Sequence, residues 1–306
     1  MNDLTDKLLK LKEQRNAVIL AHYYQDNQIQ EIADFLGDSL ALSQQAKKTD
    51  ADVILFCGVH FMAETAKILN PSKIVLLPDL NAGCSLADAA PPDKFEAWVN
   101  EHPGHTVISY INCSARVKAL SDIICTSSNA VKIVDSLPPD EKICFAPDKY
   151  LGAHVIKQTG RDMVLWDGSC QVHEYFSEIE LINLMNSFPD AQVLAHPECP
   201  ENLLHYADYI GSTTGIIHYS LKNGYNDFII LTEPGVIYSM QKAAPDKRFY
   251  SVPNLNGCAC NECPYMRLNT IEKMIAALEN MQPEIILPDE IIIKALKPLE
   301  RMLELS

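Results

Sequence analysis

The sequence predicts an α/β fold of three three-layer α/β/α domains with short parallel sheets, related by a pseudo-threefold axis that carries a shared functional site. Three observations lead to this prediction. Short apolar strands alternate with helical patterns along the chain, which is typical of parallel sheets that helices cover on both faces. The pattern recurs at offsets of 88 and 86 residues. The strands of each copy lead to polar or cysteine side chains.

The first strand of each copy sets the alignment of the repeat. It is an apolar segment that ends in polar side chains. The three copies of this strand lie within residues 18–24, 107–113 and 193–199. The equivalent residues at the strand ends are His22, Tyr110 and His196. Two residues later follow Tyr24, Asn112 and Glu198.

Three further elements complete each copy, in the same order. A short strand runs into a hydroxyl-rich helix start, which carries Ser39, Ser127 and Thr213 in the three copies. The next strands are predicted at 53–57, 143–146 and 228–232, and a helical pattern follows each. The last strands, at 74–78, 163–166 and 248–252, each lead to cysteine. We therefore expect domains at 1–100, 101–187 and 188–306, with helical ends at 1–16 and 270–306.

The composition of the chain limits its partners and its compartment. Its 306 residues carry a formal charge of −15, which argues against binding to nucleic acid or to an anionic membrane. The first residues lack the pattern of a signal peptide, and no apolar run is long enough to span a bilayer. We therefore expect a cytoplasmic protein, whose ten cysteines are kept as thiols by a reducing compartment.

The strand ends predict one asymmetric site. Parallel strands bind ligands at their carboxyl ends, and the equivalent residues there differ in type between the copies. His22 and His196 are candidate anchors or general acids, and Glu198 is a candidate general base. Three hydroxyl-bearing helix starts favour an anion site, although each hydroxyl could instead cap its helix. We expect the other histidines to be surface or structural residues: His60, His102, His105, His154, His173, His205 and His218.

One thiol per copy predicts a metal site with three cysteine ligands. Cys84 and Cys170 follow equivalent strands, and the stretch 258–263 supplies three more thiols. Three thiolates can hold a [4Fe-4S] cluster with one open iron, or zinc with an open fourth position. The repeat alone favours Cys258 as the third ligand, because the residues before it resemble those before Cys84, whereas Cys263 leads directly into the next helix. We expect the remaining cysteines to be buried thiols: Cys57, Cys113, Cys125, Cys144 and Cys199.

Seven segments of the chain together resemble the quinolinate synthase family. They lie at residues 21–25, 37–40, 110–112, 125–130, 196–199, 211–213 and 263–266. The resemblance implies three α/β/α domains around an oxygen-sensitive [4Fe-4S] cluster, with the active site on the central axis. It implies the condensation of iminoaspartate with dihydroxyacetone phosphate to quinolinate, phosphate and water in de novo NAD biosynthesis. An aspartate-oxidising enzyme would then supply the iminoaspartate.

The resemblance also implies roles for individual residues. The cluster ligands would be Cys84, Cys170 and Cys263, with Cys258 and Cys260 outside the shared motif, and the open iron would act as a Lewis acid in dehydration. Substrate-binding positions would be His22, Ser39, Tyr110, Asn112, Ser127, His196, Glu198 and Thr213. Catalytic positions, which orient substrate and move protons, would be Tyr24, Tyr110, Asn112, His196 and Glu198. Two rival hypotheses are a non-catalytic iron–sulfur redox sensor and a zinc-dependent lyase on the same scaffold.

Overall fold

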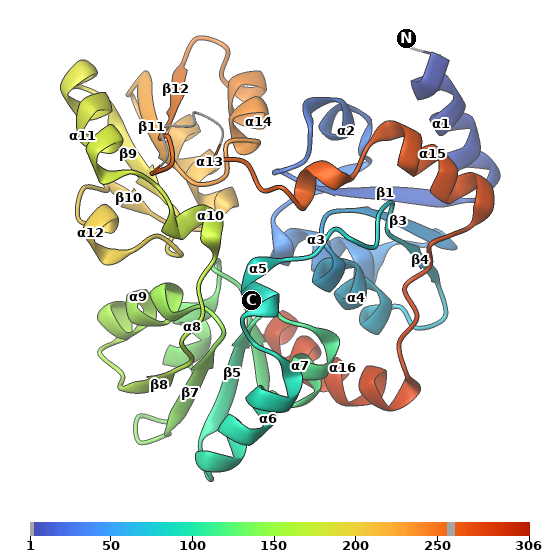
Figure 1. The fold of residues 1–306 in the computed structure, drawn as a ribbon, viewed down its shortest axis with the longest axis horizontal. Coiled ribbons are helices and arrows are strands. Elements are labelled where there is room, and N and C mark those ends of the chain that lie inside the picture. The colour runs from blue at the N-terminus through green and yellow to red at the C-terminus, as the bar shows by residue number, and fades with distance from the viewer. Residues whose placement is uncertain (1–2, 256–260) are drawn as a thin grey trace.

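A computed structural model describes residues 3–255 and 261–306 and confirms an α/β architecture with three separate parallel sheets. Each sheet contains four strands in the same spatial order, which is the second, first, third and fourth of its strands in sequence. The three sheets stand around a common centre (Figure 1), with the first at the upper right of the view, the second at the bottom and the third at the upper left. We call each sheet, with the helices between its strands, a unit.

The strands form close to where the sequence predicts them, and they are short. The first sheet contains β1 (Ala17–His22), β2 (Phe35–Gly37), β3 (Val53–Cys57) and β4 (Ile74–Leu76). The second contains β5 (Thr106–Tyr110), β6 (Ile123–Cys125), β7 (Ile143–Ala146) and β8 (Met163–Leu165). The third contains β9 (Gln192–Ala195), β10 (Tyr209–Ile210), β11 (Asp227–Leu231) and β12 (Arg248–Ser251). Strands β3 and β7 are buried along their whole length, as expected for sheets covered on both faces.

The helices alternate with the strands. Those of the first unit are α2 (Asn27–Ile32), α3 (Ser39–Lys48) and α4 (His60–Leu69), and those of the second are α7 (Ala115–Ala119), α8 (Ala130–Asp135) and α9 (Lys149–Thr159). The third unit contains α12 (Glu201–Leu204), α13 (Thr213–Lys222) and α14 (Val236–Ala243). Connections between units contain α5 (Ser85–Asp88), α6 (Pro92–Glu101), α10 (Gln171–Glu174) and α11 (Glu178–Ser187). None of the helices in the described ranges combines the length and apolar character that crossing a bilayer requires.

One hydrogen-bond pattern occurs in all three units and matches the offsets of the sequence repeat. In each unit, an aspartate ahead of the edge strand accepts a hydrogen bond, at 2.8 Å, from a backbone N–H of the neighbouring first strand. The three pairs are Asp34 with Ile19, Asp122 with Val107, and Asp208 with Val193. The backbone N–H of each aspartate also donates to the carbonyl of the same partner residue. Successive pairs are separated by 88 and then 86 residues.

Replacing Asp122 by alanine should lower the thermal stability of the protein. The substitution leaves the backbone N–H of Val107 without its carboxylate partner, and the loss of one such hydrogen bond costs about 1 kcal/mol. The readout is a lower Tm in a thermal unfolding experiment. Asp122→Asn keeps an acceptor oxygen and should lower Tm by less. Equal losses in the two variants would contradict a role for this hydrogen bond.

The C-terminal segment joins the first and second units, although it follows the third sheet in sequence. Helix α15 (Ile271–Asn280) packs against β3 and against the N-terminal helix α1 (Asp3–Gln14), and α16 (Asp289–Glu304) packs against α4, α7 and β6. Beyond α16, the side-chain amide of Asn129 donates to Oγ of Ser306 at 2.8 Å. The division of the chain at 100 and 187 stays a prediction from the repeat.

Candidate active site

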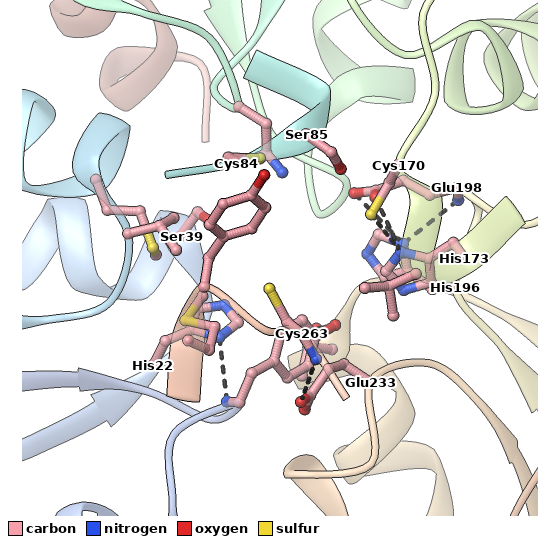
Figure 2. A pocket seen from close by; sticks show the side chains of 18 of the residues that line it. His22, Ser39, Cys84, Ser85, Cys170, His173, His196, Glu198, Glu233 and Cys263 are labelled. Atoms are coloured by element: carbon pink, nitrogen blue, oxygen red, sulfur yellow. Dashed lines mark hydrogen bonds and ion pairs between the residues drawn. The ribbon is translucent and has the colours of Figure 1, made fainter. Parts of the chain in front are cut away.

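One cavity at the centre of the molecule brings together the residues that the sequence predicts for the site. Its wall includes His22, Tyr24, Ser39, Cys84, Tyr110, Asn112, Ser127, Cys170, His196, Glu198, Thr213 and Cys263. They come from all three units, because the carboxyl ends of the three sheets face the centre. In Figure 2, the cysteines surround the space, with His22 and Ser39 on one side and His196 and Glu198 on the other.

Glu198 is the centre of a buried polar network. The residue is 2% exposed, and its carboxylate accepts a hydrogen bond from the hydroxyl of Tyr110, in the second unit. Oε1 accepts this bond and also lies 3.7 Å from Nδ1 of His196. Oε2 lies 3.0 Å from Nδ1 of His173. Burial opposes the charge of Glu198, but the adjacent His173 and the hydrogen bonds from His173 and Tyr110 outweigh it, so that the pKa lies below the usual carboxyl value. The group is therefore an ionised, water-poor base.

Two tyrosines supply proton donors beside this base. Burial raises the pKa of Tyr110 well above its ordinary value, and the adjacent charge of Glu198 raises it further. Burial likewise raises the pKa of Tyr24, whose hydroxyl lies 2.7 Å from the hydroxyls of both Thr213 and Thr232. Both phenols therefore stay protonated near neutral pH.

The two strand-end histidines are uncharged in the free protein. Burial lowers the pKa of His22 to about 4 and that of His196 to about 3, despite the nearby carboxylates of Asp38 and Glu198. In each case Nδ1 accepts a hydrogen bond from the backbone N–H two residues later, in Tyr24 and in Glu198 respectively. Because Nδ1 is an acceptor, each neutral ring carries its proton on Nε2, where it can donate. The histidines therefore fit hydrogen-bonding anchors better than permanent cations.

The predicted hydroxyls at the starts of two helices do not cap those helices. Ser39 and Thr213 are the first residues of α3 and α13, and both helices are capped by the preceding side chain. Those caps are Asp38, which accepts from Ala41 N–H, and Ser212, which accepts from Gly215 N–H. The hydroxyls of the two predicted residues are therefore not the caps. Ser127 lies before α8, and its hydroxyl is 3.1 Å from Nε2 of His196.

Three thiols meet in the cavity, one from each third of the chain. Cys84 and Cys170 precede the short helices α5 and α10, and Cys263 precedes a short 3₁₀ turn at Met266–Leu268. Burial raises the pKa of Cys84 to about 12, with a further contribution from Cys263, and burial together with Glu198 and these two thiols raises that of Cys170. Each thiol thus lies within electrostatic reach of the others. Three such soft donors fit a thiolate-ligated metal or iron–sulfur cluster, which would take them as thiolates.

The segment that carries Cys263 is held by a buried carboxylate. Glu233 is fully buried, and one carboxylate oxygen accepts from the backbone N–H of Cys263 at 3.2 Å and from the Arg267 guanidinium at 3.0 Å. Arg267 also forms an ion pair with Asp26 of the first unit, at 2.8 Å. Burial raises the pKa of Glu233 to about 7, although Arg267 opposes the shift. Cys258 and Cys260 lie outside the described residues.

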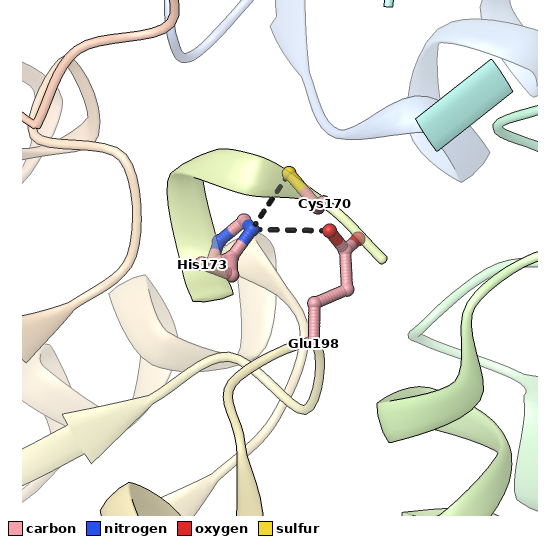
Figure 3. A group of neighbouring side chains, drawn as sticks. All are labelled: Cys170, His173 and Glu198. Atoms are coloured by element: carbon pink, nitrogen blue, oxygen red, sulfur yellow. Dashed lines mark hydrogen bonds and ion pairs between the residues drawn. The ribbon is translucent and has the colours of Figure 1, made fainter. Parts of the chain in front are cut away.

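His173 is a cavity residue that the sequence interpretation assigned to the surface or to a structural role. It is 3% exposed, and Nδ1 lies 3.3 Å from the sulfur of Cys170 as well as 3.0 Å from Glu198. Figure 3 shows these three side chains converging. The missed signal was local: a cysteine followed by histidine three residues later places both on one turn of helix. Glu233 was also missed, and nothing in its sequence neighbourhood singles it out.

Comparison with known proteins decides the family. The family model described as quinolinate synthetase A protein matches residues 6–304. The chain belongs to this family. The quinolinate synthase of Gloeothece citriformis (strain PCC 7424) is 62% identical over 304 residues, which cover 99% of this chain and 94% of that protein. That of Synechocystis sp. (strain ATCC 27184 / PCC 6803 / Kazusa) is also 62% identical over 304 residues, which cover 99% of this chain and 96% of that protein.

Membership of the quinolinate synthetase A family makes this chain an enzyme and agrees with the resemblance found in the sequence. A third relative, the quinolinate synthase of Microcystis aeruginosa (strain NIES-843 / IAM M-2473), is 60% identical over 305 residues, which cover 100% of this chain and 96% of that protein. The similarity extends over all three units and therefore over every element that lines the central cavity.

Proposed function

We propose that the protein is a quinolinate synthase, which condenses iminoaspartate with dihydroxyacetone phosphate and yields quinolinate, phosphate and water for de novo NAD biosynthesis. The observation that carries the proposal is the convergence of three thiols, an ionised glutamate and two protonated tyrosines in one buried cavity of a chain from this family. We further propose that the enzyme works in the cytoplasm, where an aspartate-oxidising enzyme supplies iminoaspartate.

Substrate binding follows from the donors around the cavity. Iminoaspartate carries two carboxylates and the triose carries a phosphate, so that the site must attract anions into a chain with a charge of −15. Backbone N–H groups at the starts of α3 and α13 favour anions, and Ser39, Ser127 and Thr213 add hydroxyl groups beside them. The Nε2–H groups of His22 and His196 complete the set of donors.

Proton transfer requires a base and an acid, and the cavity supplies both. The carboxylate of Glu198 accepts a proton from the substrate, while the hydroxyl of Tyr110, already hydrogen-bonded to it, stabilises the charged form. Tyr24, protonated and oriented by two threonine hydroxyls, donates a proton to the substrate. The amide of Asn112 orients the substrate between them. Burial of Glu198 and Tyr110 also limits the access of water, which would hydrolyse iminoaspartate.

The cofactor of the proposed reaction is a [4Fe-4S] cluster held by Cys84, Cys170 and Cys263. Three thiols from distant parts of the chain in one cavity are a donor set that suits such a cluster. When bound, a cluster with three protein ligands supplies one open iron as a Lewis acid that assists the departure of hydroxide in dehydration.

Anaerobic purification with metal analysis and a visible spectrum tests this cofactor. We expect about four irons per chain and a brown absorbance that bleaches in air. A spectroscopically silent protein with one zinc per chain would overturn the assignment. The matched control is the same preparation of a variant that lacks all three thiols, which should be colourless.

A zinc-dependent lyase is the second candidate, because one specific group of side chains favours it. Cys170, His173 and Glu198 place a sulfur, a nitrogen and an oxygen within 4.8 Å of one another, and these are donor types that zinc accepts. This site uses one of the three cysteines and leaves Cys84 and Cys263 unexplained. Metal analysis of a Cys84→Ser variant separates the candidates, since zinc at this group would remain bound whereas a three-cysteine cluster would be lost.

A further inference from the structure

Lys118 is a fully buried lysine that the proposed chemistry does not use. It lies on α7, and its Nζ donates to the carbonyl oxygen of Ile111, at 3.0 Å, and to that of Cys113. These two carbonyls flank Asn112, which lines the cavity. The ammonium group also lies 5.3 Å from the ring centroid of Phe61. A buried lysine is costly to retain in a protein interior, so its contacts call for an explanation.

Asn112 stands at the tip of the turn that Lys118 closes. The backbone N–H of Cys113 donates to the carbonyl of Ile111 at 2.8 Å, so this carbonyl accepts from both the turn and the lysine. Oδ1 of Asn112 is buried and has no hydrogen-bond partner within the described part of the chain, which leaves it available to a ligand. Lys118 therefore fixes both ends of the turn and, through them, the direction of the Asn112 side chain.

Gln30 makes the equivalent contacts in the first unit. Subtracting the repeat offset of 88 from Lys118 gives Gln30, whose Nε2 lies 2.9 Å from the carbonyl oxygens of both Tyr23 and Gln25. Those two carbonyls flank Tyr24, and they are the repeat equivalents of the two that Lys118 holds. Lys118 and Gln30 thus donate to the same pair of backbone carbonyls in the repeat, which are those on either side of Asn112 and of Tyr24.

The three units differ in the other side-chain hydrogen bonds that stabilise the loop after the first strand. In the first and third units, the ring of His22 or His196 accepts the N–H of the site residue two positions later. The second unit has Tyr110 at the equivalent position, so no imidazole is present to do this. The third unit, in turn, has Leu204 where the others have Gln30 and Lys118. The loop of the second unit therefore depends most strongly on its buried donor.

We propose that Lys118 and Gln30 are positioning residues that hold Asn112 and Tyr24 in their working orientation. This inference rests on the proposed function, because it assigns those two residues to substrate orientation and proton transfer. The effect is carried through the backbone, since the two donors contact the carbonyls on either side of Asn112 and Tyr24.

The first test is the Lys118→Met variant, which keeps an unbranched apolar side chain of similar size and removes the donor. We expect kcat/KM for quinolinate formation to fall by about tenfold to hundredfold, because small misplacements of an orienting group have effects of this size. Iron content should stay at the wild-type value. The matched control is Lys73→Met, since Lys73 bridges the carbonyls of Thr49 and Ala51 in the same way but outside the cavity. It should lower Tm without changing kcat/KM.

Three further variants separate positioning from a general loss of stability. Lys118→Gln introduces the residue that the first unit uses at this position, and it should recover part of the lost activity. In an Asn112→Ala background, Lys118→Met should change kcat/KM by no more than about twofold, because the residue through which it acts is already absent. Gln30→Met should behave likewise in a Tyr24→Phe background. Full additivity in both backgrounds would overturn the proposal.

Crystal structures of Lys118→Met and of the wild type keep this test independent of the proposed reaction. The expected result is an opened turn at 111–113 with a reoriented Asn112 side chain. An unchanged turn, with a loss of Tm like that of Lys73→Met, would make Lys118 a packing residue only. If the wild-type enzyme forms no quinolinate, the proposed function fails, and the structures alone still decide whether Lys118 positions Asn112.

Discussion

The Glu198→Gln variant should lose quinolinate formation while it keeps its iron and its fold. Glutamine has nearly the same shape but cannot accept a proton as a carboxylate does, and removing a general base typically costs about 10²- to 10⁴-fold in rate. The Tyr110 hydroxyl can still donate to the amide oxygen, so the cavity should keep its arrangement. The measurement is kcat for quinolinate under anaerobic conditions, with iminoaspartate generated in the assay, together with iron content and Tm.

Glu178→Gln is the matched control for this variant. Glu178 also accepts a hydrogen bond from a tyrosine, Tyr206, at 3.0 Å, but it does not line the cavity. The Glu178→Gln variant should keep the wild-type kcat. Wild-type activity in Glu198→Gln would remove Glu198 from the proposed mechanism, and loss of bound zinc would instead make Glu198 a metal ligand, as in the zinc-binding alternative.

Serine in place of Cys84, Cys170 or Cys263 should abolish the cluster in each of the three variants. A hydroxyl group is a poor ligand for iron in a sulfur-rich site, and no other cysteine within residues 3–255 and 261–306 lines the cavity. We expect iron to fall from about four atoms per chain to nearly none and the visible absorbance to disappear. Quinolinate formation should stop with it.

Two other cysteines provide the controls for the cluster ligands. Cys144→Ser changes a thiol buried in β7, outside the cavity, and should keep its iron. Cys258→Ser should also keep its iron, because the third ligand is assigned to Cys263. The opposite result, in which Cys258→Ser loses the cluster and Cys263→Ser retains it, would show that the alignment of the repeat identifies the ligand correctly.

The sequence predicts the three sheets well because the signals for them are local and repeated. Each strand is a short apolar run, and the same order of elements recurs at fixed offsets, so that an ambiguous segment in one unit is clarified by the other two. Several residues of the cavity were predicted in the same way, since His22, Tyr110 and His196 occupy one position of the repeat. Divergent polar residues at equivalent strand ends were the informative signal.

Contacts between distant segments could not be predicted in this way. Cys263 reaches the cavity on a segment that Glu233 and Arg267 hold, and no spacing in the sequence connects these residues. The repeat aligns Lys118 with Gln30, but their partners are backbone carbonyls, which leave no trace in residue types. The packing of α16 between the first two units depends likewise on surfaces that only the folded chain brings together.

The position of Ser306 has a practical consequence for kinetic measurements. Ser306 accepts a hydrogen bond from Asn129, and the side-chain oxygen of Asn129 in turn accepts from the backbone N–H of Thr126, the neighbour of Ser127. An affinity tag fused after Ser306 would therefore begin next to the loop that carries a proposed substrate-binding hydroxyl. Fusion ahead of α1, which packs on the outside of the first sheet against α15, avoids that loop (Figure 1). Kinetic comparisons of variants should accordingly use N-terminally tagged or tag-free protein.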